Sequence, residues 1–140
     1  MDINREPFMT GIKLIDEQHN ILFDLVEAIL KACLEDDISS DGIRAQMNKA
    51  VKYSVEHFTE EEALMRSINY PFYEKHQLEH RLFRERLDLM CEELNQPIAI
   101  DYVDYQLRLG KWLTQWFGNH INNYDLALTN FIKENSISTN

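Results

Sequence analysis

The sequence predicts an all-α protein, an up-down-up-down antiparallel four-helix bundle with an N-terminal arm. The 140 residues include only 4 Gly and 3 Pro, and no stretch of any length alternates apolar and polar residues as a strand does. Four segments instead carry apolar residues at three- or four-residue spacing, which is typical of helices. The breaks between them are short and favour antiparallel neighbours, so residues 1–140 are expected to form a single domain.

The first two helices are expected over about 16–36 and 40–68, after an arm that covers residues 1–15. Asp16 is a suitable N-cap for the first helix. The apolar positions of this helix are Ile21, Leu22, Leu25, Ile29 and Cys33. The residues "ISSDG" separate the two helices, and "NYP" ends the second one.

The third and fourth helices are expected over about 71–94 and 101–133. Pro71 suits the first turn of the third helix, because proline lacks the N–H that a first turn leaves unused. The residues "NQPIAI" break the chain before the fourth helix begins near Asp101. Residues 134–140 are expected to form a frayed tail.

The charge balance of the chain excludes two classes of partner. Lys and Arg total 14 against 24 Asp and Glu, a formal net charge of −10, whereas nucleic acids and anionic membranes require clustered cations. The start of the chain lacks the features of a signal peptide, and no segment is long enough to span a bilayer. Cys33 and Cys91 form no CxxC pattern, and we expect buried reduced thiols, although one cross-link stays compatible with the sequence. These features predict a cytoplasmic protein, expected to be a monomer.

The second helix carries polar residues on its buried face. Its apolar positions are Val51, Val55, Phe58, Leu64, Met65 and Ile68. His57 lies on this stripe, and Glu61 lies four residues after His57 and three after Phe58. Glu60 points away from the stripe, and the position of Glu62 at its edge stays open. A carboxylate in a core is costly unless it is paired or binds a metal, so Glu61 is a candidate ligand.

The other histidines also lie on inward faces. His76 and His80 are four apart on the third helix, His19 precedes Leu22 by three on the first, and His120 lies on the fourth. A single inward histidine is more often an ordinary core residue, but a pair at four-residue spacing brings two imidazoles together. With all five histidines directed inward beside a buried glutamate, the sequence favours a metal centre.

The donor types narrow the choice of metal. Five imidazoles overfill a tetrahedral zinc site, and calcium and magnesium prefer oxygen ligands. Two ions that share carboxylate bridges would use this donor set, and imidazole with carboxylate suits iron. The Glu-x-x-His pairs of ferritin-like di-iron bundles are absent. The residues three before the histidines are Asp16, Ser54, Tyr73, Gln77 and Phe117.

Four blocks of the chain, "GIKLIDEQHNILF", "HFTEEEALM", "YPFYEKHQLEHRLF" and "WFGNHINNYD", resemble the successive signature blocks of the hemerythrins in their bacterial form. The resemblance covers about residues 11–125 and implies two non-haem iron ions as cofactor. It implies His76, His80 and His120 on one iron, His19 and His57 on the other, and Glu61 and Asp125 as bridges. On an ideal helix Asp125 would lie about 140° from His120 and would have to reach the irons from the side.

The resemblance also implies a function. One iron would keep an open position that binds dioxygen reversibly as a hydroperoxide, for oxygen carriage, storage or sensing, and azide or nitric oxide are alternative ligands. The matching residues around the open position are Leu22, Phe58, Trp116 and Ile121. The chain is thus expected to be an oxygen-binding protein and not an enzyme, and a sensor would act on a separate polypeptide. The alternatives are a di-iron enzyme that acts on peroxide, nitric oxide or iron, and an interaction module with incidental histidines.

Overall fold

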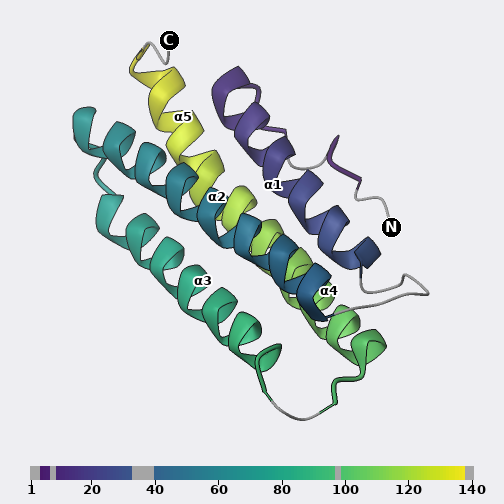
Figure 1. Cartoon of the computed structure of the whole chain (residues 1–140). Helices are drawn as coiled ribbons and strands as arrows, with labels where there is room; N and C mark the ends of the chain where they lie inside the picture. Colours follow the sequence, from purple (N-terminus) through teal and green to yellow (C-terminus); the bar gives the residue numbers. More distant parts are fainter. Residues whose placement is uncertain (1–3, 7–8, 33–39, 97–98, 138–140) are drawn as a thin grey trace.

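The chain forms a four-helix bundle in the computed structural model, which describes residues 4–6, 9–32, 40–96 and 99–137. The bundle is built by α1 (Lys13–Ala32), α2 (Ser40–Ser67), α3 (Tyr73–Glu93) and a fourth column of α4 (Tyr102–Asn119), η2 (His120–Asp125) and α5 (Leu126–Glu134). Figure 1 shows that successive columns run in opposite directions and that the described residues before α1 lie beside that helix. The predicted all-α bundle is confirmed. Within the described ranges, no helix is long and apolar enough to cross a membrane.

Two apolar clusters fill the bundle, one on each side of a polar layer. The larger cluster includes Leu22, Phe58 and Ile121, and the smaller one includes Ile15, Met65 and Leu128. Each of α1, α2 and the fourth column therefore supplies a residue to both clusters. The inward positions between these residues are occupied by His19, Glu61 and Asp125, so the polar layer lies where the two clusters meet.

The start of α1 differs from the prediction. The helix begins at Lys13, so Asp16 is not its N-cap. The Asp16 carboxylate instead lies in the first turn and accepts hydrogen bonds from residues that precede the helix. The donors are the backbone N–H of Thr10 (2.8 Å), the Thr10 hydroxyl (2.7 Å) and the backbone N–H of Gly11 (3.0 Å). Gly11 makes this turn with φ of 85°, a conformation that favours glycine. The expected end of the helix near residue 36, and Cys33, fall outside the described residues.

The start of α3 also differs, because Pro71 lies in the turn before the helix and not in its first turn. Asn69, in the connection after α2, adopts φ of 52°. The next residue, Tyr70, is buried in the smaller cluster. The backbone N–H of Tyr73 then bonds to the carbonyl of Tyr70 at 3.3 Å, which closes the turn.

Two residues assigned to the buried stripes are exposed instead. Ile21 on α1 is 44% exposed and Val55 on α2 is 39% exposed. Ser54 takes the inward position beside Val55, where its hydroxyl donates to the carbonyl of Ala50 at 2.7 Å. This local bond satisfies the hydroxyl within its own helix, so a polar residue replaces the apolar one that periodicity favoured.

The fourth column is interrupted where the sequence predicted one continuous helix. Six residues, His120–Asp125, form a π-helix between α4 and α5. In a π-helix the hydrogen bonds join residues five apart, so each turn contains more residues than in an α-helix. The π-helix changes the facing of every residue that follows it.

Candidate metal centre

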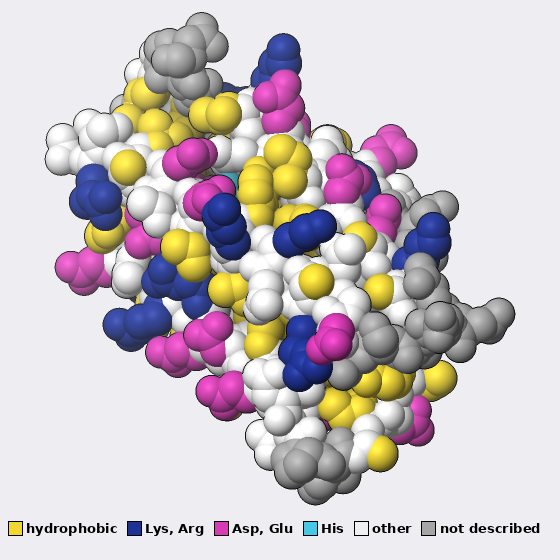
Figure 2. All heavy atoms as spheres, viewed as in Figure 1, with side chains coloured by type: hydrophobic (Ala, Val, Ile, Leu, Met, Phe, Trp, Pro, Cys, Tyr) yellow, Lys and Arg dark blue, Asp and Glu magenta, His cyan; other side chains and the backbone are white. Residues whose placement is uncertain are grey.

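All the predicted ligands are buried in one layer of the bundle. The described side chains His19, His57, Glu61, His76, His80, His120 and Asp125 are each at most 3% exposed. They come from all four columns, and almost nothing of the histidines is visible on the face drawn in Figure 2. So many polar side chains in a core require partners that satisfy them.

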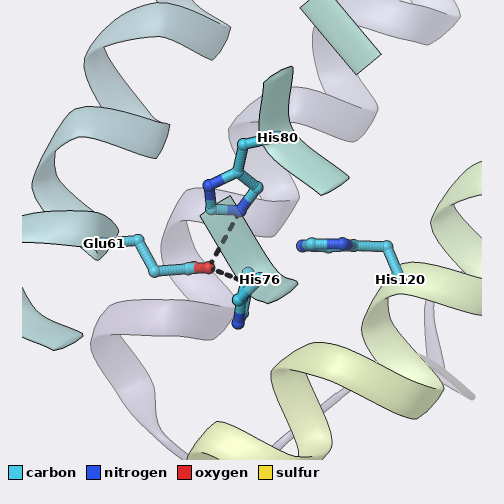
Figure 3. Close-up of side chains that lie close together, drawn as sticks. All are labelled: Glu61, His76, His80 and His120. Atoms are coloured by element: carbon cyan, nitrogen blue, oxygen red, sulfur yellow. Dashed lines mark ion pairs between the residues drawn. The ribbon is translucent and has the colours of Figure 1, made fainter. Parts of the chain in front are cut away.

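Glu61 lies between the histidines of two helices. Its Oε1 atom is 2.7 Å from Nε2 of His76 and 3.2 Å from Nε2 of His80, both on α3. Its Oε2 atom faces His57 on its own helix, at 3.6 Å from Nε2. Figure 3 shows Glu61, His76, His80 and His120 directed at one small region. The two oxygens of one carboxylate thus serve two different groups of imidazoles.

Asp125 has the same arrangement on the opposite side of the layer. Its Oδ1 atom is 3.1 Å from Nε2 of both His76 and His120. Its Oδ2 atom is 2.8 Å from Nε2 of His19. Two carboxylates therefore span the same two groups, one with His76, His80 and His120 and the other with His19 and His57.

The π-helix explains how Asp125 reaches this position. In an ideal α-helix a residue five positions after His120 would lie about 140° away from it. Because the wider π turn holds more residues, Asp125 completes little more than one turn after His120 and faces the same side. The expectation that Asp125 reaches in from the side is thus wrong. The backbone changes its pitch, and both residues point inward.

The unsatisfied atoms of the layer test whether it fits a metal. Both oxygens of Glu61, both oxygens of Asp125 and Nε2 of His76 and His80 are buried without a hydrogen-bond partner among the described residues. They approach one another within ion-pair distance, yet their geometry does not form hydrogen bonds. Unpaired buried acceptors are costly, and a cation would satisfy several at once.

Two sets of donors are close enough to bind such cations. Each set offers ligand atoms that all lie within 4.8 Å of one another. One set is Glu61, His76, His80 and His120, and the other is His19, His57 and Glu61. Glu61 belongs to both sets, so the donors fit two neighbouring ions with a shared carboxylate.

Burial and the carboxylates shift the pKa values of the imidazoles in opposite directions. Burial lowers the pKa of His57 to about 4 and also lowers the pKa of His120. Burial acts in the same direction on His76, but Asp125 and Glu61 outweigh it and raise the pKa of His76 to about 9. Burial acts to raise the pKa of Glu61, yet His76 and His80 hold it below its usual value. The Glu61 carboxylate therefore stays ionised in the metal-free layer.

The four residues that the resemblance places around the open position border this polar layer with apolar surface. Leu22, Phe58 and Ile121 are at most 4% exposed and belong to the larger cluster, against which the half-buried Trp116 packs. Phe58 stacks on His80, with ring centroids 3.9 Å apart, and Trp116 stacks on His120 at 4.3 Å. The four residues thus lie against the polar layer on the side of the larger cluster.

Two residues beside the layer did not emerge from the sequence. Glu62 is 9% exposed, and its Oε2 atom lies 3.1 Å from Nδ1 of His80. Tyr124 stacks on His120, with ring centroids 5.6 Å apart. The only sequence signal for Glu62 was its position at the edge of the apolar stripe, and Tyr124 had none because it lies in the π-helix.

Comparison with known proteins identifies a family for this chain. The family described as the hemerythrin HHE cation binding domain matches residues 10–129. The chain is 28% identical over 123 residues to a bacteriohemerythrin of Stenotrophomonas maltophilia, covering 88% of this chain and 76% of that protein. It is 26% identical over 118 residues to a hemerythrin of Phascolopsis gouldii, covering 84% and 82%.

A solved structure of wild-type hemerythrin supports the fold. It superposes with a TM-score of 0.74 at 22% identity and covers 90% of this chain and 92% of that one. The resemblance seen in the sequence is thus confirmed over most of the chain. With its four-helix bundle and its buried cluster of histidines and carboxylates, the chain belongs to the hemerythrin HHE cation binding domain family.

Proposed function

We propose that this chain is a non-haem di-iron protein that binds dioxygen reversibly, for carriage, storage or sensing. The observation that carries the proposal is the division of five imidazoles into a group of three and a group of two, with Glu61 and Asp125 each offering one oxygen to either group. Imidazole and carboxylate donors suit iron, and shared carboxylates suit two ions.

The unequal division leaves one position open. His76, His80 and His120 would hold one iron, and His19 and His57 would hold the other. If Glu61 and Asp125 each faced both ions, the ion held by His76, His80 and His120 would have one more protein ligand than the ion held by His19 and His57. An open position on a bound metal is what a small ligand requires. A ferrous pair held by these residues would supply the two electrons that reversible binding of dioxygen requires, one from each ion.

The surrounding side chains favour release over further reaction. Leu22, Phe58 and Ile121 lie in the larger apolar cluster and Trp116 packs against it, so together they would exclude water, and with it protons, from the open position. Tyr53 stacks parallel to His57 at 6.4 Å between ring centroids, but burial raises the pKa of its phenol. A phenol with a raised pKa is a weak proton donor, so it does not favour the cleavage of bound dioxygen.

Spectra of the purified, reduced protein test this proposal. Iron analysis should give close to two irons per chain without haem. Exposure to air should produce a visible charge-transfer band that fades when oxygen is stripped, with the iron returning to the ferrous state. Azide should bind at the same position in the oxidised protein. Immediate irreversible oxidation with catalytic consumption of peroxide would instead favour a di-iron enzyme.

A further inference from the structure

A hydrogen bond connects one of the histidines of the metal centre to a second acid of α2. Nδ1 of His80 lies 3.1 Å from Oε2 of Glu62, and both residues are buried. An ionised carboxylate only accepts hydrogen bonds, so Nδ1 must carry the proton. In the neutral ring, the form that binds a metal, the lone pair is then left on Nε2. This nitrogen lies 3.2 Å from Oε1 of Glu61.

This support distinguishes His80 from the other histidines. Nδ1 of His19, His57, His76 and His120 is buried without a hydrogen-bond partner among the described residues. In metal sites the second ring nitrogen usually donates to a carboxylate, a carbonyl or water, which sets the tautomer and increases the basicity of the ligand. In the described part of this chain, a side chain performs that role for His80 alone.

The position of the His80 ring is determined from two directions. Phe58 covers its face, with the two rings nearly parallel at 7° and their centroids 3.9 Å apart. Glu62 hydrogen-bonds to Nδ1 at the edge of the ring. Glu61 and Glu62 are consecutive on α2 and so point about 100° apart, which lets one acid face Nε2 and the other Nδ1. Two neighbouring acids of one helix thus contact opposite nitrogens of a single ring on α3.

We propose that Glu62 is a positioning residue that keeps His80 in the tautomer that binds iron and so slows the loss of the iron held with His76 and His120. This inference rests on the di-iron function proposed above. Removal of such a partner typically weakens metal binding by about 10–100-fold. The ligand set itself stays complete in a Glu62 variant, so any loss of affinity acts through His80.

The test compares Glu62→Ala and Glu62→Gln with Glu56→Gln, which removes the same charge from an exposed position of the same helix. Each iron-loaded protein is mixed with an excess of a ferrous chelator, and iron release is followed over time. We expect Glu62→Ala to release iron about 10–100-fold faster than the wild type. Glu62→Gln should show a smaller increase, because its amide oxygen still accepts the hydrogen bond, and Glu56→Gln should match the wild type.

A second measurement separates positioning from a general loss of packing. In the iron-loaded protein the unpaired electrons shift the imidazole N–H proton resonances of the ligands away from the rest of the NMR spectrum. One exchangeable resonance should move in both Glu62 variants while the others stay, and none should move in Glu56→Gln. If Glu62→Ala does not fold, Glu62→Gln, which has nearly the same shape, carries both comparisons.

The possible failures are distinct. Equal rates of iron release from the Glu62 variants and Glu56→Gln, with no shifted resonance, would overturn the positioning role while the di-iron site stands. A wild-type protein that does not bind two irons would overturn the proposed function first, and the role of Glu62 with it.

Discussion

Oδ2 of Asp125 on η2 lies 2.8 Å from Nε2 of His19 on α1, so the last candidate ligand of the chain meets the first. The same carboxylate also approaches His76 on α3 through Oδ1, at 3.1 Å. The metal centre therefore cannot assemble from one pair of consecutive helices, because the first and the last columns of the bundle must both be in place. Iron binding and the closure of the bundle are thus expected to be coupled.

The buried and exposed acids of α2 should differ sharply in their effect on iron. Glu61→Ala removes the carboxylate that faces both groups of histidines, so we expect the iron content to fall from about two per chain to one or less. Glu60→Ala removes an exposed acid that accepts a hydrogen bond from Gln18 at 2.9 Å, and it should leave the iron content unchanged. Metal analysis of both purified variants checks this, and equal losses would contradict the assigned facing of Glu61.

Removal of the metal should lower thermal stability. Without iron, the buried oxygens of Glu61 and Asp125 have no hydrogen-bond partners among the described residues. A ligand present at about 1,000 times its Kd stabilises the folded state by about 4 kcal/mol, which corresponds to a Tm shift on the order of 10 °C for a chain of this size. Melting curves of the loaded and metal-free protein measure the shift, and coincident curves would refute the coupling.

The metal-free protein should also lose stability as the pH rises. The pKa of His76 is raised to about 9 from its ordinary 6.5, so between these values the folded chain holds a proton that the unfolded chain releases. The contribution of His76 is therefore complete below about pH 6.5 and is lost as the pH rises through about 9. Denaturant unfolding of the metal-free protein across this range should show the decline.

His76→Gln provides the control for the pH dependence, since its side chain does not titrate. The decline between about pH 6.5 and 9 should become smaller in this variant. His57 acts in the opposite sense, because burial lowers its pKa to about 4, and its contribution is lost as the pH falls from about 6.5. An unchanged slope in His76→Gln would mean that another group controls the alkaline loss.

The apolar wall formed by Leu22, Phe58, Trp116 and Ile121 should determine how long the oxygenated protein survives before it is oxidised. Ile121 and Ile132 are both 3% exposed, but Ile121 belongs to the cluster that contains the wall and Ile132 to the other cluster. Ile121→Thr places a hydroxyl beside the open position and admits water, so oxidation to the ferric form should be several-fold faster. Ile121→Thr and Ile132→Thr should each lower the free energy of unfolding by about 1–3 kcal/mol, but Ile132→Thr should not speed the oxidation. The decay of the visible band gives the lifetime of the oxygenated form in each variant, and equal lifetimes would exclude a role for the wall.

The ease of prediction differed between residues of the site for physical reasons. Glu61 could be assigned from periodicity, because α2 is regular and a residue three or four from Phe58 and Met65 must share their face. Asp125 came only from the resemblance to hemerythrins, because periodicity assumes about 100° per residue and the π-helix breaks that assumption. Local sequence carries no clear mark of a π turn.

Contacts between helices were the other feature that the sequence could not show. The partner of Glu62 depends on where α3 places His80, and a pattern within α2 contains no such information. Ile21 and Val55 show the converse, since an apolar side chain near the edge of a stripe is buried only if a neighbouring helix covers it. The fold class could be predicted from the apolar spacing of all four helices taken together, so a few residues assigned to the wrong face did not change the prediction.

The π-helix also sets the rotational phase of everything that follows it. An insertion or deletion of one residue between His120 and Asp125 would rotate α5 by about 100° relative to α4. Leu128 and Ile132 would then turn away from the smaller cluster, and Lys133, whose Nζ donates to the carbonyl of Thr10 at 3.1 Å, would lose its hold on the segment before α1. The length of this short segment therefore determines both the position of Asp125 in the metal centre and the packing of α5 at one end of the bundle. A change in its length would disturb both at once.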